Sequence, residues 1–172
     1  MYHAKARGRA QFMFFEPAMA RAAYAALVLE SELATAVRAR QFVLHFQPQV
    51  DAQSGRLVGA EALLRWHDGN NQIPPDQFIP VAEECGLIIP IGDWVIEKAI
   101  AHIVEWRKTF GDIPPIAINL SPRQFWRSAL SDLILEKLSN AGLPNDVLEV
   151  EVTESVLLDA EGSSIDELLK LR

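Results

Sequence analysis

The segment Gly59-Ala-Glu-Ala-Leu-Leu-Arg-Trp66 has the pattern of an apolar β-strand that carries a carboxylate and a guanidinium. Because strand side chains alternate between faces, Glu61 and Arg65 share one side of the predicted strand. A charge among apolar strand residues is costly to bury unless it is paired or binds a metal. The segment therefore predicts a functional site as well as a strand.

Two later strand-like segments, 116–121 and 148–154, repeat this combination of apolar residues and oxygen donors. Asn119 lies near the end of the first segment and Glu151 near the end of the second. Carboxylate and amide oxygens are the ligands that hard cations such as Mg²⁺, Mn²⁺ and Ca²⁺ prefer. Oxygen ligands near the carboxyl ends of several strands are typical of the top of an α/β barrel. We therefore expect these two residues to converge with Glu61 on one cation site.

Each of these residues also has an ordinary structural explanation. Glu61 could be a solvated strand carboxylate or a partner for Arg65, two residues further on. Asn119 precedes a Ser-Pro helix start, where Asn often bonds to nearby backbone. From the residues alone, the site and these structural roles remain alternatives.

The acidic segment 148–154 offers more than one candidate ligand. Glu149 and Glu151 share a face, and Glu151 is preferred because it lies nearer the predicted mouth. Glu149 would lie deeper on the same face, and the alternative is that the strand presents its other face. Glu154 lies just past the strand, where it could support the site or simply begin a helix.

Two further polar residues could contact a ligand. Arg65 lies at the carboxyl end of its predicted strand, where a guanidinium could bind a phosphate with two hydrogen bonds. Gln47 precedes Pro48 on the strand 42–48 and could bind a base edge, although a satisfied structural amide is equally compatible with its position. None of the four histidines is paired at the spacing of a zinc site.

The composition limits the possible classes of protein. The chain has 172 residues, of which 49% are hydrophobic, enough for one core. Its net charge of −7 argues against a broad basic surface, so DNA and RNA are not expected partners. The single cysteine, Cys85, suits a reducing compartment and a cytoplasmic location. No segment has the length of apolar sequence that a membrane span needs.

Hydrophobic periodicity predicts a helix at 17–40 that connects an upstream segment to an α/β domain. Alternating strands and helices after residue 57 indicate a parallel sheet, while a short turn at 51–55 would pair the first two strands. The other predicted elements are, in chain order, strands at 42–48 and 57–66, helices at 78–85 and 92–110, a strand at 116–120, a helix at 132–140 and a strand at 148–153. Asp76 is the expected N-cap of the helix at 78–85.

From about residue 42, the chain resembles the amino-terminal half of an EAL domain, the cyclic-di-GMP phosphodiesterase family. The resemblance extends over more than a hundred residues and rests on several motifs in order. These are Phe46-Gln-Pro48, Gly59-Ala-Glu-Ala-Leu-Leu-Arg-Trp66, Pro80-x-Ala-Glu83, Asn119-Leu-Ser121 and Glu151-Val-Thr-Glu-Ser155.

The resemblance implies the amino-terminal half of a TIM-like (β/α)8 barrel whose first strand is antiparallel. It also implies a bacterial signalling enzyme that hydrolyses cyclic-di-GMP to linear diguanylate with two Mg²⁺ or Mn²⁺ ions. By this resemblance Glu61, Asn119 and Glu151 are metal ligands, and Glu61 and Glu154 are catalytic, with Glu154 steadying the site. Arg65 would then contact a phosphate and Gln47 a guanine.

The resemblance also divides the chain. Residues 1–16, with the pattern Tyr2-x-Ala-Lys-x-x-Gly-Arg9, resemble the end of a GGDEF diguanylate cyclase domain, so the expected division is 1–16, connector helix 17–40 and partial EAL domain 41–172. The family's Asp-Asp-Phe-Gly motif does not occur before Arg172. We therefore expect this chain alone to be inactive. The alternatives are a non-catalytic cyclic-di-GMP receptor and an inactive fragment.

The predicted parent protein has upstream GGDEF or sensory segments, which could anchor it to a membrane. A connector helix between signalling domains could also pair with its counterpart in a homodimer. The candidate seam on this helix is formed by Leu27, Leu33 and Val37. We expect the helix to make few contacts with the α/β domain, and the alternative is that it packs on its own domain.

Overall fold

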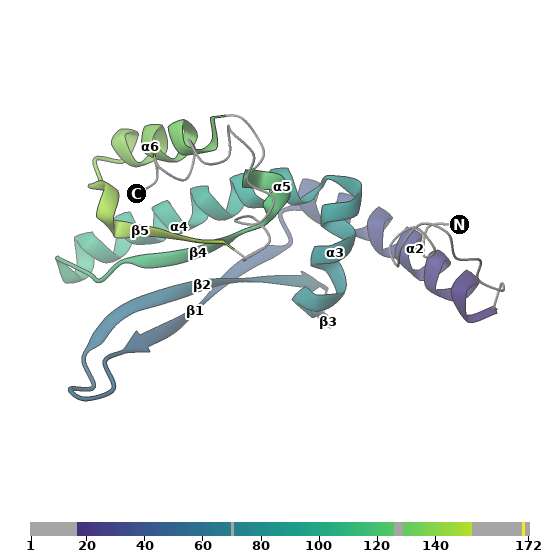
Figure 1. Ribbon diagram of the computed structural model, residues 1–172, viewed down its shortest axis with the longest axis horizontal. Helices are drawn as coiled ribbons and strands as arrows, with labels where there is room; N and C mark the ends of the chain where they lie inside the picture. The colour runs from purple at the N-terminus through teal and green to yellow at the C-terminus, as the bar shows by residue number, and fades with distance from the viewer. Residues whose placement is uncertain (1–16, 70, 126–128, 153–169, 171–172) are drawn as a thin grey trace.

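The computed structural model describes residues 17–69, 71–125, 129–152 and 170. A long helix leads into a mixed sheet with helices packed on it (Figure 1). The elements are, in chain order, α2 (Pro17–Ala39), β1 (Phe42–Val50), β2 (Leu57–Asp68), β3 (Asn71–Ile73), α3 (Pro75–Cys85), α4 (Ile88–Phe110), β4 (Ile116–Leu120), α5 (Pro122–Phe125), α6 (Leu130–Asn140), the 3₁₀ turn η1 (Asn145–Val147) and β5 (Leu148–Val152).

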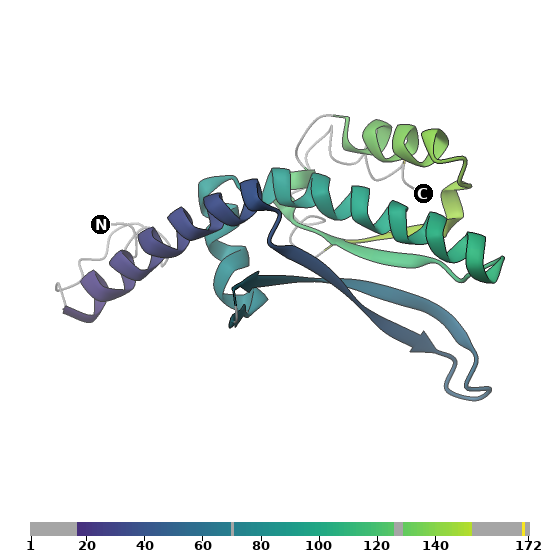
Figure 2. The same ribbon diagram turned by 180° about the vertical axis from the view of Figure 1, so that it is seen from behind.

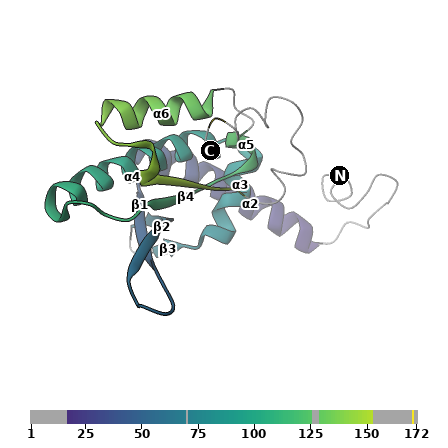
Figure 3. The same ribbon diagram turned by 60° about the vertical axis from the view of Figure 1, so that its left-hand side comes forward.

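The sheet has the order β1-β2-β4-β5, and β3 pairs with β2. β1 and β2 form an antiparallel hairpin in which Gln47 lies opposite Glu61, and this hairpin extends away from the helices (Figure 3). β2, β4 and β5 are parallel neighbours. The predicted α/β fold is therefore confirmed, including the antiparallel first strand and the preceding helix.

The core lies between the sheet and the helices on one of its sides. α4 and α6 lie on the same side of β4 and β5, as Figures 1 and 2 show from opposite directions. Trp66 at the far end of β2 is fully buried and packs edge-on against Phe78 of α3, with Phe42 of β1 beside both rings. Alternate strand positions therefore face the core, and the positions between them face away from these helices.

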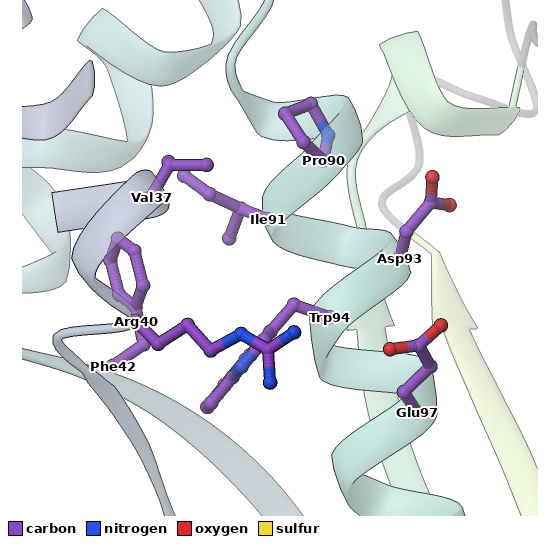
Figure 4. Close-up of a pocket in the computed structure, with 8 residues that line it drawn as sticks. All are labelled: Val37, Arg40, Phe42, Pro90, Ile91, Asp93, Trp94 and Glu97. Atoms are coloured by element: carbon purple, nitrogen blue, oxygen red, sulfur yellow. The ribbon is translucent and has the colours of Figure 1, made fainter. Parts of the chain in front are cut away.

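The junction between α2 and β1 is a tight turn held by backbone hydrogen bonds. Arg40 has the left-handed φ of 55°, which turns the chain sharply after the helix. The N–H of Gln41 donates to the carbonyl of Ala36, and the carbonyl of Gln41 accepts from the N–H of His67. Figure 4 shows the pocket at this junction, with Arg40 extending toward Trp94 on α4. The end of α2 is thus tied to the hairpin and faces α4.

The two halves of α2 differ in burial. Leu33 and Ala36 are fully buried, and α2 packs on α3. Tyr24 and Leu27, nearer the start of the helix, are 71% and 64% exposed. Leu33 therefore belongs to the core of its own chain, and its assignment to a dimer seam was wrong. The expectation that this helix makes few contacts with the domain was wrong for its second half.

Three local expectations differ from the structure. α4 begins at Ile88 rather than at 92, because Pro90 falls in the first turn, where its missing N–H removes no helix bond. Asp76 is not the N-cap of α3 but lies in its first turn, after Pro74 at the cap. β3 was not predicted, although the chain reverses through Gly69, whose φ is 58°, to pair with β2.

Among the described residues, no helix combines the length and apolar character required to cross a membrane.

Candidate functional site

The candidate site lies on the face of the sheet opposite α4 and α6. Glu61 alternates with the buried Ala60 and Ala62, so its side chain is on the other face of β2. Asn119 and Glu151 occupy equivalent positions on β4 and β5, where they are exposed. Three adjacent parallel strands therefore each contribute one oxygen-bearing side chain to the same face.

Glu61 lies in the middle of β2, not near its carboxyl end as the sequence suggested. The parallel pairing of β2 with β4 covers only Ala60–Ala62, whereas the rest of β2 continues against β1 and β3. Glu61 is thus at the centre of the short region where the antiparallel hairpin meets the parallel sheet. The long hairpin explains the difference, because it extends the strand well beyond the site.

Direct contacts join these strands. The side-chain amide of Asn119 donates a hydrogen bond from Nδ2 to Oε1 of Glu61, at 2.6 Å. Asn119 and Glu151 are register partners on β4 and β5, and neighbouring strands lie about 4.8 Å apart. The amide therefore lies between the two carboxylate-bearing strands.

The carboxylates influence one another electrostatically. Partial burial raises the pKa of Glu151 above its ordinary value, and the negative charges of Glu61 and Glu149 raise it further. The ionised form of Glu151 is therefore disfavoured in the folded chain. Since the folded state holds this proton more tightly than the unfolded state, Glu151 contributes a loss of stability as the pH rises from the ordinary glutamate range through its raised pKa.

We predict that Glu61→Gln lowers the pKa of Glu151 in metal-free protein, because the substitution removes a nearby negative charge and keeps an oxygen that can accept from Asn119. The pKa is measured by carbon-13 NMR titration of the Glu151 carboxyl group. Glu136→Gln, on the exposed side of α6, is the matched control and leaves the titration unchanged. An unchanged Glu151 pKa in Glu61→Gln would contradict the described proximity.

The two predicted ligand-contacting residues lie on the β1–β2 hairpin. Gln47 is exposed and is the register partner of Glu61. Arg65 is on the same face of β2 as Glu61, two positions further along that face, and its Nη1 donates to the carbonyl of Leu64 at 2.9 Å. Glu154 lies outside the described residues.

Sequence reasoning missed one buried polar residue beside the site, Gln124 of α5. Its Oε1 accepts a hydrogen bond from the N–H of Ser121 at 3.0 Å, immediately after β4. The spacing Ser121-x-x-Gln124 is that of a capping box, in which the third helical residue reaches back to the N-cap. The signal was therefore present in the sequence.

The donor set is compatible with a hard divalent cation. Two carboxylates and one amide supply oxygen ligands, and the repulsion that raises the Glu151 pKa is the kind that a bound cation relieves. In the part of the chain that the structure describes, no group of three or more His, Cys, Asp or Glu residues could hold a metal. The candidate site therefore includes the amide of Asn119 beside the two carboxylates.

Comparison with known proteins gives a consistent result. The model of the EAL domain family matches residues 30–172. The bifunctional diguanylate cyclase/cyclic di-GMP phosphodiesterase MucR of Pseudomonas aeruginosa is 42% identical over 167 residues, which are 96% of this chain and 24% of MucR. The oxygen sensor protein DosP of Escherichia coli is 38% identical over 160 residues, 92% of this chain and 20% of DosP. The chain thus spans a quarter or less of the length of these relatives.

Solved structures of similar fold agree with the family match. The PaMucR phosphodiesterase in complex with c-di-GMP has a TM-score of 0.76 and 40% identity, over 83% of this chain and 58% of that structure. The EAL enzyme Bd1971 in its cGMP-bound form has a TM-score of 0.79 and 28% identity, over 89% of this chain and 43% of that structure. The family match, the relatives and the shared fold lead to one conclusion: this chain belongs to the EAL domain family.

Proposed function

We propose that this chain forms part of a site that binds cyclic-di-GMP and hydrolyses it to linear diguanylate. The observation that supports the proposal best is the hydrogen bond between Asn119 and Glu61, together with the register of Asn119 with Glu151. It brings the oxygen donors of three strands to one face, as a divalent-cation site requires. The c-di-GMP complex of the similar PaMucR phosphodiesterase supports the choice of ligand.

In this proposal Glu61, Asn119 and Glu151 hold Mg²⁺ or Mn²⁺. When bound, a pair of such ions supplies Lewis acidity and lowers the pKa of bound water. The amide oxygen of Asn119 is its ligand atom, while the carboxylates of Glu61 and Glu151 offset the ionic charge. Glu154 supports this arrangement.

The hairpin residues would orient the substrate. Arg65 would exchange its hydrogen bond to the Leu64 carbonyl for hydrogen bonds to a phosphate, since a guanidinium matches two phosphate oxygens. Gln47, opposite Glu61, would hydrogen-bond to a guanine edge with its amide. Substrate would therefore lie across the β1–β2 hairpin, with its scissile phosphate near Glu61.

The test is incubation of the full natural protein with cyclic-di-GMP and either Mg²⁺ or Mn²⁺, followed by chromatography. We expect linear diguanylate to accumulate and chelation of the metal to stop its formation. Tight binding of cyclic-di-GMP with no product formed in the presence of either metal would favour the alternative, a receptor that holds cyclic-di-GMP without cleaving it.

We further propose that the chain operates beside an upstream GGDEF-type or sensory segment. The similar protein MucR, a bifunctional diguanylate cyclase/cyclic di-GMP phosphodiesterase that matches 96% of this chain, supports this arrangement. Homodimer formation also remains a proposal, to be tested by sedimentation of the full natural protein at several concentrations.

A further inference from the structure

Gly92 on α4 and Gln124 on α5 form an unusual buried pair. Glycine within a helix is unfavourable, since it has greater conformational freedom in the unfolded chain. Here the position is buried, and a Cβ on Gly92 would overlap the amide nitrogen of Gln124. The side chain of Gln124, only 4% exposed, therefore lies in the space that the absent Cβ leaves.

The buried amide of Gln124 fixes the end of β4. Its Oε1 accepts from the N–H of Ser121 at 3.0 Å, while its own backbone N–H donates to the carbonyl of Ser121 at 3.0 Å. These two bonds close the first turn of α5 directly after the strand. Phe125, which is 1% exposed, also donates its N–H to the carbonyl of Ser121 and anchors the turn in the core.

This turn begins two residues after Asn119. Leu120, between them, is buried on the core side, which keeps Asn119 on the opposite face. If the turn were released, β4 could fray from its end, and the amide of Asn119 would lose its fixed direction toward Glu61. The hydroxyl of Ser121 is buried and has no hydrogen-bond partner among the described residues, so the Gln124 amide is the side-chain contact that holds this residue.

We propose that Gln124, seated against Gly92, is a positioning residue that orients Asn119 toward Glu61. The inference rests on the proposed function, in which Asn119 is a ligand, and it adds the part of the fold that holds this ligand in place. Gln124 contacts neither Glu61 nor Asn119 in any described hydrogen bond, so it acts through the backbone of Ser121. Residues that orient metal ligands typically change metal affinity or activity by about 10-fold to 100-fold when they are substituted.

The test compares variants in the full natural protein. Gln124→Met preserves length and removes the acceptor, whereas Gln124→Glu restores an acceptor oxygen. Gly92→Ala keeps Gln124, but the added methyl group displaces the Gln124 amide from the space beside α4. Arg123→Met, at the exposed neighbouring position on α5, is the matched control.

Two readouts are used. The first is Mn²⁺ affinity, from the electron paramagnetic resonance signal of free Mn²⁺. We expect about a 10-fold loss in Gln124→Met and Gly92→Ala, none in Arg123→Met, and recovery in Gln124→Glu. Hydrolysis lost by Gln124→Met at limiting Mn²⁺ should return at saturating Mn²⁺, which a general loss of folding would not allow.

The second readout needs no metal. In protein labelled with nitrogen-15 asparagine, the side-chain amide signal of Asn119 should shift in Gln124→Met toward that of an exposed asparagine and return in Gln124→Glu. An Asn119 signal that is identical in wild type and Gln124→Met would overturn the inference. Failure of the wild type to bind Mn²⁺ would refute the proposed function, while the Asn119 signal would still decide the role of Gln124.

Discussion

Under the proposed function, Glu61→Gln is expected to lower cyclic-di-GMP hydrolysis by the full natural protein by more than about 100-fold. The substitution removes the negative charge of a proposed metal ligand, and residues that only orient metal ligands already account for about 10-fold to 100-fold in metal affinity or activity. Because glutamine can still accept a hydrogen bond from Asn119, the sheet should remain intact. The lower rate of hydrolysis would therefore come from a change at the site and not from unfolding of the domain.

The measurements are initial rates of linear diguanylate formation and Mn²⁺ affinity, both on the full natural protein. Glu105→Gln, on an exposed position of α4, removes the same charge elsewhere and should leave both values unchanged. Glu149→Gln is the informative comparison, because Glu149 shares the face of Glu151. If Glu149→Gln were as damaging as Glu61→Gln and Glu151→Gln were harmless, the ligand on β5 would have to be reassigned.

The parallel part of the fold was predictable because local sequence dominates there. The short apolar segments that became β4 and β5 have no polar positions on their core face, and each is followed by a turn or helix signal. The first residue of α4 was harder to predict from the sequence. A glycine at position 92 suggests a helix boundary, and only the packing of Gln124 against it explains a glycine within the helix.

The juxtaposition at the site was predictable only in part. Strand alternation put Glu61 on a polar face, but the opposition of Gln47 to Glu61 depends on the register of the hairpin. That register is fixed by the local turn between β1 and β2 and by the burial of Phe42 and Trp66 at the other end, and only this burial depends on tertiary packing. The contribution of Gln124 required the tertiary structure, although its capping-box spacing was visible.

The helix α2 provides a matched test of which segments belong to the folded domain. Leu33→Ala is expected to lower the free energy of unfolding by about 2–5 kcal/mol, since Leu33 is fully buried and its truncation leaves a cavity. Leu27→Ala, on the same helix, should change it by no more than about 0.5 kcal/mol, because Leu27 is 64% exposed and alanine favours helix formation.

Both free energies are measured by urea unfolding followed by circular dichroism, with wild-type protein alongside. The family match begins at residue 30, within α2, and the burial of Leu33 gives this boundary a physical basis. Equal small losses in the two variants would mean that α2 is a connector independent of the domain. A large loss of unfolding free energy confined to Leu33→Ala would show that the second half of α2 is part of the domain. A displacement of this helix would then strain α3 and the hairpin that carries Gln47 and Glu61.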